Sequence, residues 1–331
     1  MTPRQLGSTG PKTFPLGLGC MGMSDFYGPA DRTESLATLA MAIERGMTLL
    51  DTGDFYAMGH NELLLQEGLR NVKRDQVQIS VKFGALRGPD ASWLGFDCRP
   101  AAVKNFVAYS LKRLGTDYID IYRPARLDPN VPIEDTVGAI ADLVKAGYVR
   151  HIGLSEMNAE TIRRAHRVHP IVDLQIEYSL ISRGIEDKIL PACRELGIAI
   201  TAYGVLGRGL ISGHWSKAQR VEANDFRGHS PRFDPANIDR NLALVEALRH
   251  VAAAKGVSVA QIVIAWALSR GSDIIPLVGA RRRDRLTEAL GALEVKLTAE
   301  DIAAIEKAVP PEAVAGARYP EHGMASLDSE R

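Results

Sequence analysis

The segment Leu49-Leu50-Asp51-Thr52-Gly53-Asp54-Phe55-Tyr56 joins a short apolar run to a carboxylate, and a tyrosine follows five residues later. A second β-prone run, Ile79-Ser80-Val81, ends in Lys82 about one strand–helix unit further along the chain. If the two runs are neighbouring parallel strands, their carboxyl ends lie at the same rim of a sheet. The pattern therefore predicts that Asp51, Tyr56 and Lys82 lie close together.

These three side chains suit acid–base chemistry. A cation beside a phenol favours the phenolate, so we expect Lys82 to lower the pKa of Tyr56 from its usual value of about 10. We expect Asp51 to hold Lys82 charged and in place, so that Tyr56 donates a proton near neutral pH. The alternative is three ordinary surface residues, but their matched positions after two strands favour a joint role.

The rest of the chain repeats the same strand–helix unit. Short β-prone runs predict eight strands, at residues 16–19, 47–50, 77–81, 118–122, 151–154, 172–176, 199–203 and 274–278. Apolar periodicity and end signals predict helices, at residues 31–46, 61–69, 100–114, 132–146, 159–168, 185–196, 241–255, 259–269, 283–290 and 298–308. This alternation predicts a (β/α)8 TIM barrel. A doubly wound parallel sheet is the alternative.

Three segments lie outside this repeat. Two β-prone pieces flank Gly7-Ser8-Thr9-Gly10-Pro11, which predicts an N-terminal β-hairpin over one end of the fold. A long Gly-, Ser- and Arg-rich insertion spans residues 204–237, and the extra helices follow it. The tail at residues 310–331 is rich in Pro, Gly and Ala, so we expect it to be loosely ordered. No linker is evident, and residues 1–331 are predicted to form one domain.

The overall composition narrows the class of protein. The 331 residues are 46% hydrophobic and 24% charged, as in ordinary globular proteins. Forty basic and forty acidic residues give zero net charge, which argues against a nucleic-acid or membrane-surface partner. We expect no membrane span or signal segment. Cys20, Cys98 and Cys193 are widely spaced and fit neither a disulfide framework nor a metal site, so we expect a cytoplasmic protein without a metal.

Polar and aromatic residues follow three further strands. Ser155, Gln175 and Tyr203 stand at the ends of the predicted fifth, sixth and seventh strands. Ser155 and Gln175 can exchange hydrogen bonds with a carboxamide, and Tyr203 can stack on a flat ring. The alternative for each is a satisfied core residue. On one rim, the three together suit a nicotinamide.

The chain after the last two strands carries glycines and arginines. Gly279 permits a close backbone approach, and four arginines lie among residues 281–285 at the start of a helix. Their charge is unfavourable at a helix N-terminus but suits a phosphate group. The loop Leu206-Gly207-Arg208-Gly209 is predicted to lie over a pyrophosphate. A solvated basic face is the alternative for the arginines.

With these motifs in place, the chain resembles the aldo-keto reductases over nearly its whole length. The stretches that carry the resemblance are Gly17-Leu18-Gly19-Cys20-Met21-Gly22-Met23, Asp51 to Tyr56, Gly59-His60-Asn61-Glu62, Val81-Lys82-Phe83-Gly84, Leu127 to Thr136, Ile152 to Glu156, Gln175-Ile176-Glu177-Tyr178, Leu206 to Gly209 and Gly279 to Arg285. The resemblance implies a (β/α)8 barrel that transfers hydride between NADPH and a carbonyl compound. It implies Asp51, Tyr56 and Lys82 as three of four catalytic residues. It also implies that Arg281 and Arg285 bind the 2′-phosphate, with Glu288 matching the family in type, which favours NADP over NAD.

Two positions depart from the family's pattern. The family usually has a histidine before Arg-x-Asp-Pro after the fourth strand, whereas this chain has Ala125. A methyl group cannot donate a hydrogen bond, so we consider Arg123, Arg126 or an ordered water as the replacement. The alternative is that both arginines support the loop or face solvent. Ala289 stands where an adenine-facing Asn or Gln often lies, which leaves the adenine contacts open.

The sequence thus predicts an NADP(H)-dependent oxidoreductase that reversibly reduces aldehydes or ketones. Its partner is expected to be a small carbonyl or alcohol substrate, in a pocket lined by loop aromatics such as Phe26, Trp93 and Trp215, with Arg123 and Arg126 nearby. The absent histidine motivates a second hypothesis, an NADPH-binding sensor or regulatory subunit with little turnover. A third is a barrel lyase that uses Lys82 as a Schiff-base amine.

Overall fold

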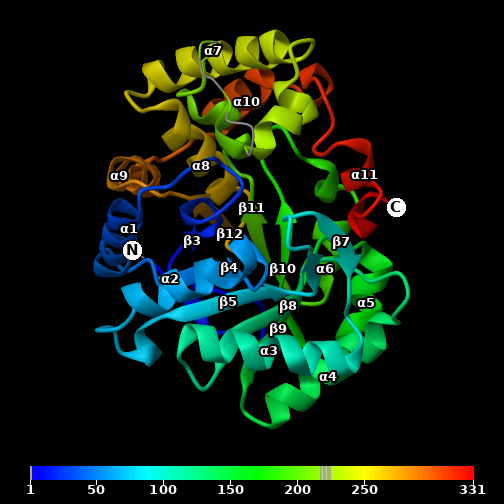
Figure 1. Ribbon diagram of the computed structural model, residues 1–331. Helices are drawn as coiled ribbons and strands as arrows, with labels where there is room; N and C mark the ends of the chain where they lie inside the picture. Colours follow the sequence, from blue (N-terminus) through cyan, green and yellow to red (C-terminus); the bar gives the residue numbers. More distant parts are fainter. Residues whose placement is uncertain (1, 217, 219–220, 222–224) are drawn as a thin grey trace.

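Eight parallel strands close into a barrel, with helices around it (Figure 1). The computed structural model describes residues 2–216, 218, 221 and 225–331, so part of the predicted insertion at residues 204–237 lies outside the described residues. The barrel strands are, in spatial order, β3 (Gly17–Gly19), β4 (Leu49–Gly53), β5 (Gln78–Phe83), β8 (Ile119–Pro124), β9 (Val149–Ser155), β10 (Ile171–Glu177), β11 (Ala199–Tyr203) and β12 (Ile274–Gly279), and β12 pairs with β3. The predicted (β/α)8 TIM barrel is confirmed.

Alternate residues of the barrel strands belong to two separate hydrophobic clusters. Leu49 and Ile121 lie in a small cluster with Leu6, whereas their neighbours Leu50 and Tyr122 lie in a large one with helix residues. Successive side chains of a strand point to opposite faces, so the small cluster fills the barrel interior and the large one joins the barrel to its helices. This alternation decides which polar residues point into the barrel.

The helices mostly follow the predicted ranges, as α1 (Arg32–Glu44), α2 (His60–Gly68), α3 (Pro100–Leu114), α4 (Ile133–Lys145), α5 (Ala159–Val168), α6 (Ile189–Glu195), α7 (Ile238–Ala254), α8 (Val259–Ser269), α9 (Arg283–Gly291) and α10 (Ala299–Ala308). The prediction for residues 185–196 differs, because a short 3-10 turn, Gly184–Glu186, precedes a shorter α6. The sequence also did not indicate the antiparallel hairpin of β6 (Ala85–Arg87) and β7 (Trp93–Phe96), which follows β5.

The predicted N-terminal hairpin closes one end of the barrel. It consists of β1 (Arg4–Gln5) and β2 (Lys12–Thr13), which pair antiparallel. Leu6 is fully buried and belongs to the interior cluster. Gly7 has φ +62°, and a Cβ there would lie 2.3 Å from the Val172 carbonyl oxygen. Only glycine fits this turn, which brings Leu6 under the barrel.

The prediction of a loosely ordered tail at residues 310–331 is wrong. The segment contains α11 (Glu321–Met324), and its end lies beside the start of α5 (Figure 1). Asp328 accepts hydrogen bonds from the backbone and side chain of Asn158, and Arg318 pairs with the buried Glu156. These polar contacts with distant parts of the chain order the tail, and composition does not reveal them.

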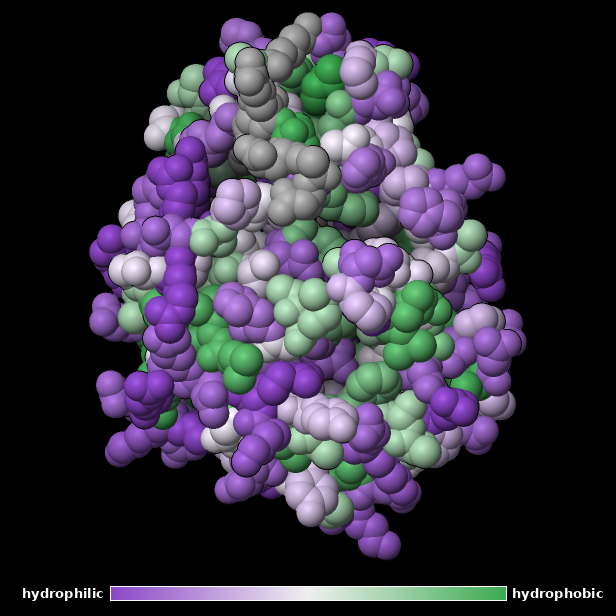
Figure 2. All heavy atoms as spheres, in the orientation of Figure 1, coloured by the Kyte–Doolittle hydropathy of each residue, from purple (hydrophilic) through white to green (hydrophobic). Residues whose placement is uncertain are grey.

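The described part of the chain contains no single helix that is long and apolar enough to cross a membrane. Helices α7 and α8 reach the required length and composition only as a pair, and they are bent by 85° with respect to one another. The face drawn in Figure 2 is mostly hydrophilic, with hydrophobic residues in small groups between the charged ones.

Candidate active site

The carboxyl ends of β4 and β5 bring Asp51 and Lys82 into contact. The register pairs Asp51 with Ser80 and Gly53 with Lys82, so both side chains point into the barrel. Lys82 Nζ donates to Asp51 Oδ2 at 2.6 Å, and both side chains are buried. Asp51 Oδ1 accepts from Gln175 Nε2 at 2.7 Å and from Ser80 Oγ at 3.1 Å. Side chains from β5 and β10 thus hold the carboxylate on β4, and its orientation is determined.

Tyr56 begins a strained turn directly after β4. Ala57 and Met58 have φ of 46° and 50°, a left-handed conformation that side-chain-bearing residues rarely adopt. The Ala57 amide donates to Asp25 Oδ2 at 2.9 Å, and Asp25 pairs with Arg87 at 3.4 Å. These contacts stabilise the turn, and Lys82 Nζ lies 5.2 Å from the centre of the Tyr56 ring.

The expectation that Lys82 lowers the pKa of Tyr56 is wrong. Burial raises the pKa of Tyr56 well above its usual value of 10, and the Asp51 carboxylate raises it further, while Arg126 opposes the shift. Burial also lowers the pKa of Lys82, against the effect of Asp51. Desolvation disfavours both charged forms. Tyr56 therefore keeps its proton through the neutral range, as a proton donor must.

Aromatic rings pack around Tyr56, which is buried. The ring of Phe26 lies 6.0 Å from that of Tyr56, and Phe55 lies 4.9 Å away. Trp93 packs against both, at 6.1 Å from Phe26 and 5.8 Å from Phe55. The structure therefore brings Phe26 and Trp93 to Tyr56. Phe55 was missed, although it precedes Tyr56 in the sequence.

Trp215 lies apart from this group. Its ring contacts Phe233 at 4.7 Å and packs against the large hydrophobic cluster, and the guanidinium of Arg227 lies 4.9 Å from its centre. The structure does not bring Trp215 to the rings around Tyr56. The spacing of the aromatic residues in the sequence does not indicate that Trp215 lies apart from Phe26 and Trp93.

Arg123 does not line a pocket, which corrects that prediction. Its side chain is fully buried in the barrel and pairs with Asp173 at 2.9 Å. It also donates to Ser80 Oγ at 2.8 Å. The hydroxyl of Thr201 donates to the same oxygen of Asp173. Arg123 thus belongs to a buried polar layer beneath Asp51, because strand alternation turns it inward.

Ser155 and Gln175 lie side by side at the ends of β9 and β10, where they form a register pair. Gln175 Nε2 is committed to Asp51, which the sequence did not indicate. Ser155 Oγ is buried and has no hydrogen-bond partner among the described residues. Buried polar atoms normally have partners, so this free hydroxyl beside an amide fits a ligand with a carboxamide group.

Glu156 connects the barrel mouth to the C-terminal tail. Its Oε1 accepts from the Tyr203 hydroxyl at 2.7 Å, and its Oε2 accepts from Arg318 at 2.8 Å and from Ser329. The Tyr203 hydroxyl also lies 2.9 Å from that of Tyr319. Arg318 and Tyr319 are therefore part of the rim. Sequence reasoning missed them because the tail shows no periodicity or motif.

Glu156 makes the stability of the protein depend on pH. Burial opposes its charged form, but Arg318 and Arg126 lower the pKa of Glu156 to about 2. The resulting stabilisation, on the order of 3 kcal/mol, is present above the unfolded pKa of about 4.5 and is lost as the pH falls toward 2. We expect Glu156→Gln to destabilise the protein at pH 6, and the difference from wild type to shrink at pH 3.

Urea unfolding at both pH values measures this effect. The control is Glu246→Gln, because Glu246 is 63% exposed and, within the described part of the chain, pairs only with Arg249 three residues away. An equal difference between wild type and Glu156→Gln at the two pH values would contradict the prediction.

The arginine-rich segment after β12 faces two loops. Gly279 is exposed, and a Cβ there would meet no atom within 4 Å. Arg281 donates to the Gly28 carbonyl oxygen at 3.2 Å. Arg285 lies 3.3 Å from Glu288, which also binds His214 at 2.7 Å. The backbone at Gly279 is thus open to a ligand, and the two arginines flank it.

The loop after β11 is more constrained than predicted. The segment from Leu206 to Gly209 forms a turn in which Arg208 has φ +58° and Gly209 φ +95°. Arg208 pairs with Glu177 at 3.2 Å and donates to the Arg318 carbonyl oxygen at 3.0 Å. Arg208 therefore binds the tail and the barrel, and its guanidinium is not free for a pyrophosphate. Arg227 lies 5.3 Å from the Tyr27 ring and adds a cation that the sequence did not single out.

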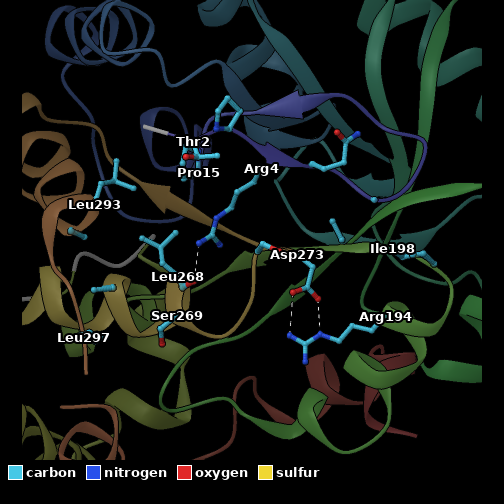
Figure 3. Close-up of a pocket in the computed structure, with 18 of the residues that line it drawn as sticks. Thr2, Arg4, Pro15, Arg194, Ile198, Leu268, Ser269, Asp273, Leu293 and Leu297 are labelled. Carbon is cyan, nitrogen blue, oxygen red and sulfur yellow. Dashed lines mark hydrogen bonds and ion pairs between the residues drawn. The ribbon is translucent and has the colours of Figure 1, made fainter. Parts of the chain in front are cut away.

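A cavity of about 920 Å³ lies at the opposite end of the barrel, beneath the N-terminal hairpin. Figure 3 shows that Arg4 points toward Leu268 and that Asp273 pairs with Arg194. Arg4 donates to three backbone carbonyl groups, which occupy three of its five donors. Barrel active sites lie at the other end, and the charged groups here are paired. We therefore place the candidate site at the strand carboxyl ends.

Across the described ranges, no group of His, Cys, Asp or Glu side chains could hold a metal ion.

The fold and the site define a (β/α)8 barrel with acid–base groups at its mouth. A family model described as Aldo/keto reductase family matches residues 15–310. "Probable aldo-keto reductase 1" of Glycine max is 41% identical over 320 residues, which cover 96% of this chain and 91% of the relative. The chain therefore belongs to the aldo/keto reductase family.

Solved structures agree with this assignment. The glycerol dehydrogenase AKR11B4 from Gluconobacter oxydans is 25% identical, with a TM-score of 0.85, and the match covers 93% of this chain and 96% of that one. The aldo-keto reductase AKR11C1 from Bacillus halodurans (holo form) is 27% identical, with a TM-score of 0.78 and coverage of 97% and 99%. The protein is an oxidoreductase of a family that acts on small carbonyl substrates.

Proposed function

We propose that residues 1–331 act as one barrel domain that reduces aldehydes or ketones to alcohols with NADPH, and that the reaction is reversible. The observation that carries the proposal is the buried Lys82–Asp51 pair, 2.6 Å long, beneath the ring of Tyr56. A buried ion pair that is held by three strands is costly to build, and such perturbed groups are concentrated at functional sites. The lyase hypothesis is weaker, because Lys82 is already committed to Asp51.

The mouth of the barrel offers groups that would hold the cofactor. The Ser155 hydroxyl, which has no partner among the described residues, would bind the carboxamide, and the ring of Tyr203, whose hydroxyl donates to Glu156, would stack on the nicotinamide. The open backbone at Gly279 and the turn from Leu206 to Gly209 would border the pyrophosphate. When bound, NADPH supplies the hydride for the carbonyl carbon.

The residues around the substrate oxygen control the proton. Tyr56 is protonated in the neutral range and donates its proton to the oxygen, which becomes the alcohol hydroxyl. Lys82 then stabilises the phenolate that remains, because its charge lies beside the ring. Asp51 keeps Lys82 in this position. In the reverse reaction, the phenolate accepts the proton of the alcohol.

A panel of aldehydes and ketones, assayed with NADPH and with NADH, tests the function. Oxidation of NADPH by any of them supports a reductase. Tight NADPH binding without turnover on the whole panel would instead favour a sensor or regulatory subunit, which the absence of a histidine at Ala125 motivates.

The preference for NADPH is expected to depend on Arg285. We expect Arg285→Ala to raise the KM for NADPH by about 10- to 100-fold, because a charged hydrogen bond to the 2′-phosphate is worth about 1.5–3 kcal/mol. The KM for NADH should remain unchanged, since NADH lacks this phosphate. Steady-state kinetics with both cofactors measure the effect.

Arg283→Ala is the matched control for this prediction. Arg283 belongs to the same arginine-rich segment, but it is paired with Glu34 of α1 at 2.9 Å. If Arg283→Ala changed the KM for NADPH as much as Arg285→Ala does, general surface charge and not a specific phosphate contact would explain the preference.

A further inference from the structure

The residue that follows β8, Ala125, has no hydrogen-bond donor in its side chain. Ala125 is 2% exposed, and its backbone amide donates to the Phe83 carbonyl oxygen at 2.8 Å. Its backbone is therefore held beside β5, and a methyl group stands at the position where the family's pattern has a histidine. A developing negative charge on a substrate oxygen needs a donor at such a position.

The side chain of Arg126 places a positive charge beside Ala125. Its Nη1 donates to the carbonyl oxygen of Ala125 at 2.6 Å, so the guanidinium is folded over the preceding residue. Its Cζ lies 6.0 Å from the ring centre of Tyr319, on the tail that borders the site. Its charge also opposes the rise of the Tyr56 pKa. The guanidinium thus lies beside Ala125 and at the rim next to the tail.

The guanidinium of Arg126 differs from its neighbours in having no carboxylate in direct contact among the described residues, although the charge of Glu156 acts on it. Arg123 pairs with Asp173, Arg208 with Glu177 and Arg318 with Glu156. For Arg126, the described residues provide one hydrogen-bond acceptor, the Ala125 carbonyl, and no ion pair. Because an arginine carries five N–H donors, most of them are free for a ligand.

We propose that Arg126 polarises the substrate carbonyl in place of the histidine, and this inference rests on the proposed function. Hydride adds to the carbonyl carbon, the π electron pair moves to the oxygen, and Tyr56 supplies the proton. Arg126 transfers no proton, because a guanidinium stays charged at all working pH values. It stabilises the charge on the oxygen until the proton arrives.

The test begins with Arg126→Met, assayed with 4-substituted benzaldehydes and NADPH. Loss of one donor to a developing oxyanion costs about 10²–10³-fold in kcat, so we expect a loss of this size in a protein that still folds and binds NADPH with an affinity near that of wild type. Electron-withdrawing substituents should accelerate the variant more steeply than wild type, because the substrate must then stabilise its own charge. Arg126→Lys should recover at least tenfold of the loss. The control is Arg164→Met, which removes a half-exposed ion pair with Glu134.

A double variant separates this inference from a merely structural role. Ala125→His should raise the rate little in wild type, where a donor is present, but should restore much of the rate in the Arg126→Met background. A large gain from Ala125→His alone would overturn the proposal, as would an Arg126→Met variant within threefold of wild-type kcat. A rate loss in Arg126→Met that is matched by lost NADPH affinity or lost folded protein would also overturn it. If the wild-type protein reduced no carbonyl compound, the proposed reductase function would be wrong. If it did so but Arg126→Met had no effect, only the role of Arg126 would be wrong.

Discussion

Tyr56→Phe is expected to lower kcat for carbonyl reduction by about 10²–10⁴-fold, the range typical for loss of a general acid. The phenol is buried and protonated in the neutral range, and no other hydroxyl donor precedes or follows it in the turn from Phe55 to Gly59. The change removes one oxygen and keeps the ring packing with Phe26 and Phe55. Steady-state NADPH oxidation measures the loss, and a fluorescence titration should show unchanged NADPH affinity.

Tyr122→Phe is the matched control for the Tyr56 variant. Tyr122 is also fully buried, but its hydroxyl lies on the outer face of β8, 3.5 Å from the Val103 carbonyl oxygen. Its loss should leave kcat within a few-fold of wild type. Near-normal turnover in Tyr56→Phe would exclude Tyr56 as the proton donor.

Arg123→Met is expected to reduce the free energy of unfolding by about 3–5 kcal/mol, because it leaves Asp173 as a buried charge without its partner. Both side chains are fully buried, and Asp173 Oδ1 already lacks a hydrogen-bond partner among the described residues. Urea unfolding with a conformational probe measures the change. The loss should also loosen Asp51, since Ser80 connects Arg123 to it.

The double variant Arg123→Met with Asp173→Asn tests the cause. Neutralising both partners removes the uncompensated charge, so most of the lost stability should return. If Arg123→Met alone cost less than about 1 kcal/mol, or if the double variant were no more stable than the single one, the buried pair would not explain the effect.

The sequence predicted the fold and the main site because both depend on local signals. Apolar runs of strand length alternate with helical periodicity, and this alternation indicates a parallel barrel. The side chains that follow parallel strands then share one rim, which relates Asp51 to Lys82 without any knowledge of the tertiary structure. Phe26, Trp93 and Trp215 were predicted to lie in loops at this rim, and the structure brings the first two, but not Trp215, to the rings around Tyr56. The roles of all these residues stay predictions.

Other features depend on contacts between residues far apart in the chain. The pairing of Glu156 with Arg318 spans 162 residues, so composition alone suggested a loose tail. Strand alternation places Arg123 in the barrel interior, but only the presence of Asp173 on β10 shows why a charge is tolerated there. Arg208 is likewise unavailable to a ligand because it pairs with Glu177 and donates to the Arg318 carbonyl oxygen of the tail.

The sequence by itself determined the barrel, the family and which acid–base groups meet at the strand ends, because strand period and spacing are local properties. Only the tertiary structure decided their protonation, the place of the tail and the free guanidinium of Arg126. Burial and charge pairing depend on everything packed around a group, so the pKa of Tyr56 rises where the Lys82 ammonium alone would lower it.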